Sequence, residues 1–321
     1  MLTTLPDEGR EIADRRRPML QPACMLHAVG RAQRFSFRGL LHWPRRFVYR
    51  DLAPARPRHT GSHNAGGCLA RHKGPSLKHR LQAAVEGIYG PMNFVRQVEW
   101  REILHRLVPG EGENILDAAC GYGLLSVKIA RTGADVSGID ISMDALRAAA
   151  LTSNVLRVFC GLSRQDAHSL AFPTNTFDKV VSSSALEHFG RDDIALSELE
   201  RVLKPGGVLV LTCDSLLLPM DEKIKELHRR TARVVNYYTK GEAVTKLERA
   251  GFDVIRAEYI LKTRLTNAFY QLGIKLRWIG LLWIGVSFLA TPICLLSEAT
   301  CGDREHGQTV IVQARKRGFA R

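Results

Sequence analysis

The chain has 321 residues and a formal net charge of +14, so it has room for one large domain or two small ones. The charge is uneven: residues 1–80 hold sixteen Lys/Arg against five Asp/Glu, a net of +11, and the remaining 241 residues have a net of +3. The seven cysteines are odd in number and widely spaced, with no C-x-x-C pair. This pattern indicates neither a disulfide framework nor a zinc site and favours a reducing compartment.

Residues 1–75 form a basic leader with six prolines after residue 15 and little sustained apolar periodicity. Between Arg15 and Arg80 the only acid is Asp51. Such a segment buries too little surface to offset its ordering entropy, so we expect it to be mostly disordered. It could serve as an arm for nucleic acid or as an organelle transit peptide, and a solvated tail without a role is favoured.

Two helical patterns precede the first expected strand. Apolar residues recur at helical spacing in 81–88, and again in 94–108, where the pattern ends at Pro109-Gly110. We expect both helices to cover a ligand cleft.

From residue 114 onward, strand and helix patterns alternate, which predicts a parallel sheet with helices on both faces. Thr239 and Glu242 form a capping-box pattern that opens a helix ending at Gly251. The last two expected strands are 252–260 and 309–314. The earlier expected elements are strand 114–119, helix 123–132, strand 134–139, helix 142–153, strand 159–165, strand 177–183, helix 191–203 and strand 207–213.

The most informative stretch is the run from Leu116 to Gly123, followed by Asp140 at the end of the next expected strand. Gly121 and Gly123 allow a tight turn that approaches a ligand closely, and an acid at Asp140 can bind both hydroxyls of a ribose. The pattern therefore predicts a nucleoside-containing cofactor.

The residues also discriminate between cofactors. The G-x-G-x-x-G pattern of dinucleotide-binding folds is incomplete, and Asp117 would repel a phosphate but attract an ammonium group. S-adenosylmethionine is therefore favoured over NAD. Residues 114–214 resemble the class I S-adenosylmethionine-dependent methyltransferases, in particular the broad group that includes quinone-biosynthesis enzymes. The resemblance also covers, in order, Asp166-Ala167, Phe177-Asp178, Ser184-Ala185-Leu186-Glu187-His188 and Leu203-Lys204-Pro205-Gly206-Gly207.

The resemblance implies a doubly wound, seven-stranded, mostly parallel sheet of the Rossmann-like methyltransferase type within 76–321, with the last strand antiparallel beside the sixth. It also implies that Asp117 and the glycine turn hold the methionine part of the cofactor, Asp140 the ribose and Asp166 the adenine. The family often has glycine where this chain has Ala119, so we expect a slightly tighter pocket. The complete expected cofactor set is Asp117, Ala119, Gly121, Gly123, Asp140, Ile141, Asp166, Ala167 and Ser184.

Catalytic candidates follow the fourth expected strand. His188 lies where the transferred methyl group is expected, and imidazole titrates near neutrality, so His188 is the candidate base and Glu187 a helper. The alternative is that both residues only pack against the cofactor loop. Tyr237 and Tyr238 could line an aromatic pocket or simply pack. No metal site is expected.

Residues 262–304, between the last two strands, form an unusual insertion. Its segment 278–297 contains no charged residue and is about 30 Å long as a helix. A single membrane crossing is excluded if residues 309–314 join the sheet, so we expect an interfacial hairpin or a lid, bent at Pro292. The stretch before it combines Leu, Phe and basic residues, as in helices that bind anionic lipid. A buried core helix pair or a dimer interface is the alternative.

These observations lead to one expected function and two rivals. We expect methyl transfer to a small lipophilic acceptor by direct displacement, in a cytoplasmic protein attached peripherally to a membrane through 262–304. One rival is an RNA methyltransferase that uses the basic leader. Residues 182–185 lack the N/D-P-P-Y/F arrangement of base-amino methyltransferases, which argues against nucleic acid. The other rival is a membrane-associated protein that binds S-adenosylmethionine without turnover.

Overall fold

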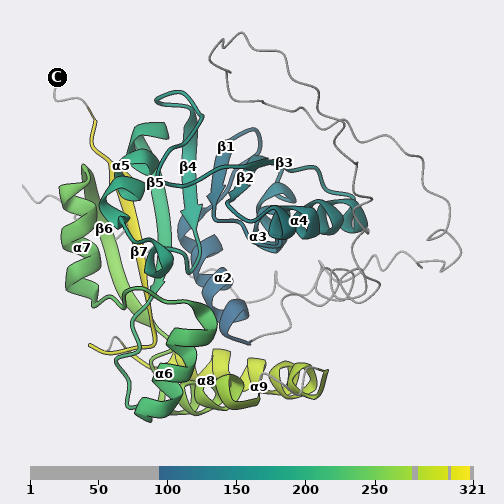
Figure 1. Cartoon of the computed structure of the whole chain (residues 1–321), viewed down its shortest axis with the longest axis vertical. Helices are drawn as coiled ribbons and strands as arrows, with labels where there is room; N and C mark the ends of the chain where they lie inside the picture. Colours follow the sequence, from purple (N-terminus) through teal and green to yellow (C-terminus); the bar gives the residue numbers. More distant parts are fainter. Residues whose placement is uncertain (1–93, 277–280, 303–304, 319–321) are drawn as a thin grey trace, which may run out of the picture. The chain divides into compact units, whose positions relative to one another are not determined.

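The computed structural model describes residues 94–276, 281–302 and 305–318 (Figure 1). The expected leader and the expected helix at 81–88 lie outside these residues.

The described residues form one seven-stranded sheet in the order β3-β2-β1-β4-β5-β7-β6. Neighbouring strands from β3 to β5 are parallel, and β7 runs antiparallel between β5 and β6. The sequence-based prediction of a doubly wound, mostly parallel sheet with an antiparallel last strand is therefore confirmed. The strands are β1 (Asn114–Ala118), β2 (Asp135–Asp140), β3 (Gly161–Arg164), β4 (Phe177–Ser182), β5 (Leu203–Asp214), β6 (Phe252–Ile260) and β7 (Thr309–Lys316).

Helices connect the strands and cover both faces of the sheet (Figure 1). They are α2 (Phe94–Leu107), α3 (Leu124–Ala130), α4 (Met143–Leu156), the short 3-10 helix η3 (Leu186–His188), α5 (Asp192–Val202), α6 (Glu222–Ala232), α7 (Lys240–Arg249), α8 (Arg264–Leu276) and α9 (Leu281–Thr300).

Strand residues divide between two hydrophobic cores because successive side chains point to opposite faces. In β1, Leu116 packs in the cluster that holds residues of α5 and α7, and its neighbour Ile115 packs in the cluster that holds residues of α2 and α3. The same division separates Val180 from Val181 in β4. Burial on both faces explains the continuous apolar runs of β5 and β7, whose residues also divide between the two cores.

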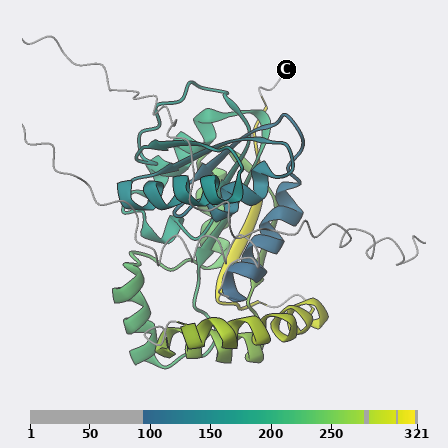
Figure 2. The ribbon, with the colours of Figure 1, turned by 90° about the vertical axis from the view of Figure 1, so that its right-hand side faces the viewer.

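Helices α6, α8 and α9 lie at the end of the sheet where β4, β5 and β6 finish (Figures 1 and 2). In the view of Figure 2, α8 and α9 extend across this end like a bar. A third core, which includes Phe94, Leu261, Tyr270 and Cys294, joins the two helices to the start of α2. The insertion thus stands at the carboxyl end of the sheet, where ligands of open α/β sheets bind.

Local signals mostly predicted the element ends. The capping box is present: Thr239 Oγ1 accepts from the Glu242 N–H, and Glu242 accepts from the Thr239 N–H.

The strand expected at 159–165 is shorter, since Phe159 is 82% exposed and lies before β3. The helix of the insertion continues through Pro292 without ending there. Helix α6 was not predicted because it is strongly polar and buries only Ile224.

Candidate functional site

The glycine turn connects β1 to α3 and has left-handed backbone at three positions, Ala119 (φ 62°), Gly121 (φ 53°) and Gly123 (φ 71°). A Cβ on Gly121 would meet nothing within 4 Å, so the turn faces open space there. A Cβ on Gly123 would lie 2.8 Å from the Ala149 Cβ, so this glycine allows α4 to pack closely. The family's preference for glycine at Ala119 thus concerns backbone conformation, and the expectation based on pocket width missed this cause.

Asp117 lies beneath the turn and is buried. Its Oδ2 accepts a hydrogen bond from Ser126 Oγ at 2.5 Å. Burial raises the pKa of Asp117 to about 6, and the nearby Asp140 adds to this, while the bond from Ser126 acts against it. Ser126 occupies the third glycine position of G-x-G-x-x-G, and sequence reasoning missed its role as the partner of Asp117.

Asp140, at the end of β2, is bonded to the turn. Its Oδ2 accepts from the Gly121 N–H at 2.9 Å, and its Oδ1 accepts from the Ser142 N–H at 2.8 Å. The carboxylate therefore fixes the turn and leaves its remaining lone pairs for a ligand. Beside it, the apolar side chains of Tyr122 and Ile141 are exposed, as suits contact with a flat heterocycle.

The third strand contributes Asp166 and Ala167 to the same edge of the sheet. Asp166 Oδ1 accepts from the His168 N–H at 3.0 Å and lies 2.6 Å from His168 Nδ1. These bonds lower the pKa of Asp166. Ala167 is buried behind it.

Ser184, after β4, is held by a residue that sequence reasoning missed. Glu99 on α2 is buried, and its Oε1 accepts from Ser184 Oγ at 2.7 Å, from Ser183 Oγ at 3.0 Å and from Thr212 Oγ1. Its Oε2 pairs with Arg96 at 2.6 Å. Burial acts to raise the pKa of Glu99, but the Arg96 charge and these hydrogen bonds outweigh it and lower the pKa. Helix α2 is thus tied to the ends of β4 and β5.

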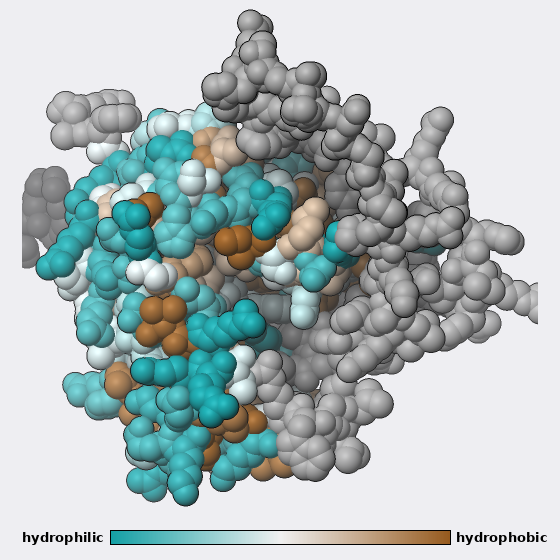
Figure 3. Space-filling view, viewed as in Figure 1, coloured by the Kyte–Doolittle hydropathy of each residue, from teal (hydrophilic) through white to brown (hydrophobic). Residues whose placement is uncertain are grey.

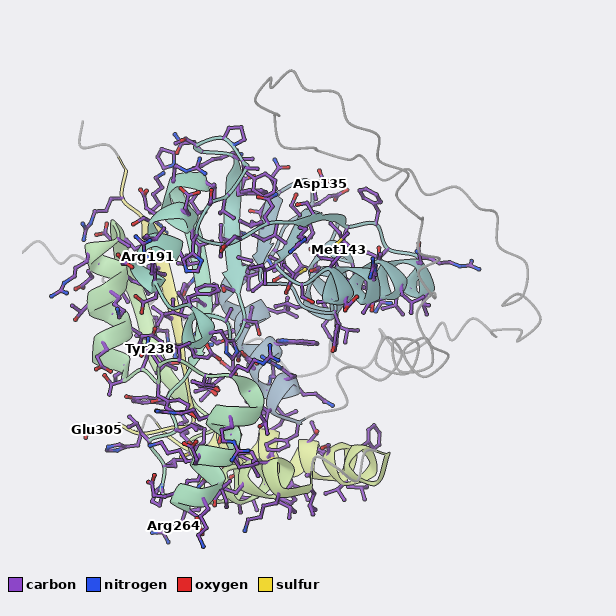
Figure 4. The ribbon with its side chains drawn as sticks, in the orientation of Figure 1. Asp135, Met143, Arg191, Tyr238, Arg264 and Glu305 are labelled. Carbon is purple, nitrogen blue, oxygen red and sulfur yellow. The ribbon has the colours of Figure 1, made fainter. Side chains whose placement is uncertain are left out.

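The two candidate catalytic residues lie side by side in η3 but in different surroundings. Glu187 is buried, and burial raises its pKa well above the usual range, with the neighbouring Asp214 adding to the effect. His188 is exposed, and its Nδ1 lies 3.4 Å from the Arg233 carbonyl oxygen. Tyr238 is a packing residue: it is buried, and its hydroxyl donates to Asp192 at 2.5 Å. Figure 4 labels Tyr238 above α6.

In the described residues, no group of three or more His, Cys, Asp or Glu side chains is arranged to hold a metal ion. Instead, Asp117, Asp140 and Asp166 lie within or just after β1, β2 and β3, at the edge of the sheet where the glycine turn follows β1.

Comparison with known proteins identifies this arrangement. Residues 116–211 match the family model described as a methyltransferase domain. The region is a class I S-adenosylmethionine-dependent methyltransferase domain. S-adenosylmethionine is the cofactor of this class, and the open turn at Gly121 with the acids around it fits it.

Two curated relatives are named for quinone substrates. Demethylmenaquinone methyltransferase of Corynebacterium kroppenstedtii is 36% identical over 113 residues, covering 35% of this chain and 47% of that protein. Ubiquinone biosynthesis O-methyltransferase of an Azoarcus species is 38% identical over 100 residues, covering 30% and 42%. The matches thus span about half the length of these relatives.

Among solved structures, phosphoethanolamine N-methyltransferase 2 of Haemonchus contortus, in complex with S-adenosyl-L-methionine, superposes with a TM-score of 0.53 at 21% identity. It covers 73% of this chain and 56% of that one. At this identity the likeness shows the shared methyltransferase fold.

Proposed function

We propose that this protein transfers the methyl group of S-adenosylmethionine to a small lipophilic acceptor by direct displacement. The observation that carries the proposal is the edge of the sheet in the methyltransferase domain, where an open glycine turn lies among three acids. The names of the two relatives, which refer to quinones, support an acceptor that is apolar and ring-shaped.

Within this proposal, each residue at the edge has a part in binding the cofactor. Asp140 would accept hydrogen bonds from the ribose hydroxyls, and the backbone at Gly121 would lie against the methionine part. Asp166 would accept from the adenine amino group, with Ile141 and Ala167 against the ring. The resemblance gave Asp117 a direct contact with the methionine part, but its carboxylate is buried and bonded to Ser126, so we propose that it supports the turn from below. Ser184 supports this surface from β4. The cofactor supplies an electrophilic methyl group on a sulfonium.

Direct displacement needs an aligned acceptor and a group that takes its proton. Glu187 and His188 remain candidates for this group. Although His188 is exposed to solvent, the protein around it partly desolvates the ring and lowers its pKa, which favours the neutral imidazole that a base requires.

The insertion supports attachment to a membrane surface. Helix α9 buries its small residues Ser287, Ala290, Thr291 and Cys294, which recur at helical spacing, and turns large apolar side chains outward. In Figure 3, apolar surface is visible at the lower end of the molecule beside hydrophilic side chains. The outward apolar residues of α9 are Val286, Phe288, Leu289, Ile293 and Leu296, with exposures of 36–72%.

Helix α8 adds charge to this apolar surface. Arg264 and Lys275 are exposed on it together with Leu265 and Leu272, and Figure 4 labels Arg264 at the helix start. Apolar side chains with basic neighbours suit the surface of a bilayer that contains anionic lipid. Of the helices in the described residues, none combines the length and hydropathy that a membrane span requires.

The test is to incubate the full chain with methyl-labelled S-adenosylmethionine and separated lipid and aqueous cell extracts. Label is expected in the lipid fraction. Label only in water-soluble small molecules would reject the lipophilic acceptor, and label in RNA would favour the rival that uses the basic leader. Cofactor binding without transfer into any fraction would favour a non-catalytic binding protein.

A further inference from the structure

A histidine that no part of the proposed function uses lies at the end of the sheet. His228 projects from α6; its Nδ1 lies 3.2 Å from the Tyr237 hydroxyl and its Nε2 lies 3.3 Å from the Tyr270 hydroxyl on α8. Nε2 also lies 3.6 Å from Oδ2 of Asp214, the last residue of β5. These four residues, Asp214, His228, Tyr237 and Tyr270, are called the His228 cluster below.

A second, independent observation points to a ligand beside this cluster. Both carboxyl oxygens of Glu187 are buried, and neither has a hydrogen-bond partner within the described part of the chain. Glu187 is 1% exposed and near enough to Asp214 for the two groups to interact electrostatically. A buried polar group without a partner is costly, so a site that keeps one is expected to satisfy it with a ligand.

The cluster stands next to the cofactor edge. Asp214 ends β5, and Glu187 follows β4, which pairs with β1. These two groups therefore follow strands that are one and two places from β1 in the sheet, at the same carboxyl end as the glycine turn. Tyr270 belongs to the insertion, so the same two helices that present apolar residues outward also line this cluster.

The charges near the cluster nearly cancel. Arg96 pairs with Glu99. Burial raises the pKa of Asp214 to about 7 although the Arg96 charge acts against this, and burial together with the nearby Asp214 raises the pKa of Glu187 well above its usual range. Such a site has little net negative charge to hold an ammonium group, and it is rich in groups that both donate and accept hydrogen bonds. A neutral hydroxyl on an aromatic ring matches it better than an amine.

Resting on the proposed function, we propose that the His228 cluster and Glu187 form the acceptor site, that the acceptor is a ring hydroxyl, and that His228 is its base in place of the two candidates from η3, Glu187 and His188. The acceptor oxygen forms the new bond to the methyl carbon as the carbon–sulfur bond breaks, and that electron pair stays on sulfur. The acceptor hydroxyl takes the place of the Tyr270 hydroxyl at Nε2 of His228, and its proton passes to that nitrogen. Asp214 stabilises the resulting imidazolium, and Tyr237 fixes the ring through Nδ1. Glu187 bonds a neighbouring oxygen of the acceptor.

Binding to the full chain tests this assignment without turnover. Calorimetry with S-adenosylhomocysteine present would compare 4-propylcatechol with 4-propylbenzylamine, which is a cation at pH 7. We expect the catechol to bind more tightly, and His228→Gln and Glu187→Gln to weaken it at least tenfold. His105→Gln, at an exposed histidine of α2, is the matched control. Equal catechol affinity in all variants, no catechol binding to the wild type, or tighter binding of the amine would overturn the inference.

Two further measurements separate the possible failures. Binding heat from S-adenosylhomocysteine alone reports an intact cofactor site. If the wild type gives no such heat, the result counts against the proposed function. If it gives this heat but does not bind the catechol, the result counts against this inference only. Tyr237→Phe keeps the aromatic packing if His228→Gln does not fold. With labelled cofactor and 4-propylcatechol, His228→Gln should lower kcat about 100-fold and remove the acidic limb of the kcat pH profile. An unchanged profile would contradict the assignment of His228 as base.

Discussion

Glu298, near the end of α9, accepts a hydrogen bond at Oε1 from the hydroxyl of Thr266 on α8 at 2.7 Å. The same oxygen accepts from the backbone N–H groups of Lys262 and Thr263, at 2.9 and 3.1 Å. The end of one insertion helix therefore satisfies backbone donors at the start of the other.

Replacing Glu298 by Ala should loosen the insertion. The Lys262 N–H loses its acceptor and the Thr263 N–H keeps only Thr266 Oγ1, at 3.2 Å. A charged acceptor is worth about 1.5–3 kcal/mol. We expect faster amide hydrogen exchange over α8, measured by mass spectrometry, with little change in β1 and β4. Glu298→Gln keeps an acceptor oxygen and should recover part of the protection. Equal exchange in all three proteins would show that this contact does not hold the helices together.

Ala119→Gly should stabilise the protein. An L-residue with φ of 62° costs about 1 kcal/mol that glycine does not, so the free energy of unfolding in urea should rise by about that amount. Ala118→Gly, at the neighbouring buried position of regular β1, is the matched control and should destabilise. A loss of stability in both variants would mean that the left-handed backbone at Ala119 carries no strain.

Asp117 should make stability fall as pH rises. Its pKa is about 6 in the folded chain against 3.8 ordinarily, so the folded chain favours the protonated carboxyl. The stability that this protonated group contributes is fully present below about pH 4 and is lost as the pH rises through 6. The difference corresponds to about 3 kcal/mol. In urea unfolding from pH 4.5 to 7.5, the free energy of unfolding of Asp117→Asn should rise relative to that of the wild type as the pH increases. Asp135→Asn, at the exposed start of β2, should follow the wild type throughout. A constant difference between Asp117→Asn and the wild type would refute the raised pKa.

Asp140→Asn should weaken binding of the cofactor. One charged acceptor for the ribose is lost, so calorimetry with S-adenosylhomocysteine should show about a 10- to 100-fold higher Kd. The control is Asp144→Asn, at a side chain that is 90% exposed in the first turn of α4. If the two variants bind equally well, the ribose assignment fails.

Leu289→Asp combined with Phe288→Asp should release the protein from vesicles. These side chains are 72% and 60% exposed on α9, and a carboxylate is repelled by anionic lipid. Flotation with vesicles of phosphatidylcholine and phosphatidylglycerol should fall at least fivefold. Phe159→Asp changes an equally exposed ring beside β3 and serves as the control. Unchanged flotation of the double variant would place the membrane contact elsewhere.

Sequence patterns predicted the sheet well because its strands are buried on both faces and separated by strong turn signals. The capping box at Thr239 and the apolar run of β5 are local, so they needed no tertiary information. Helix α6 was not predicted from the sequence because a polar helix with one buried residue shows no apolar stripe.

The cofactor edge was predictable and the neighbouring side chains were not. Asp117 and Asp140 belong to one continuous motif, whereas Glu99, Asp214 and His228 come from distant elements that only the fold brings together. Their contacts span more than a hundred residues in the case of Glu99 and Thr212. A lone histidine in a polar stretch carries no signal that such partners exist.

The place of β7 has a consequence for biosynthesis. Because residues 309–316 lie between β5 and β6 in the sheet, the strand formed from 252–260 has no backbone partner until residues 309–316 have left the ribosome. Its apolar surface, and that of the two helices that follow it, is exposed throughout that interval. A nascent chain paused before residue 309 is therefore a natural client for chaperones.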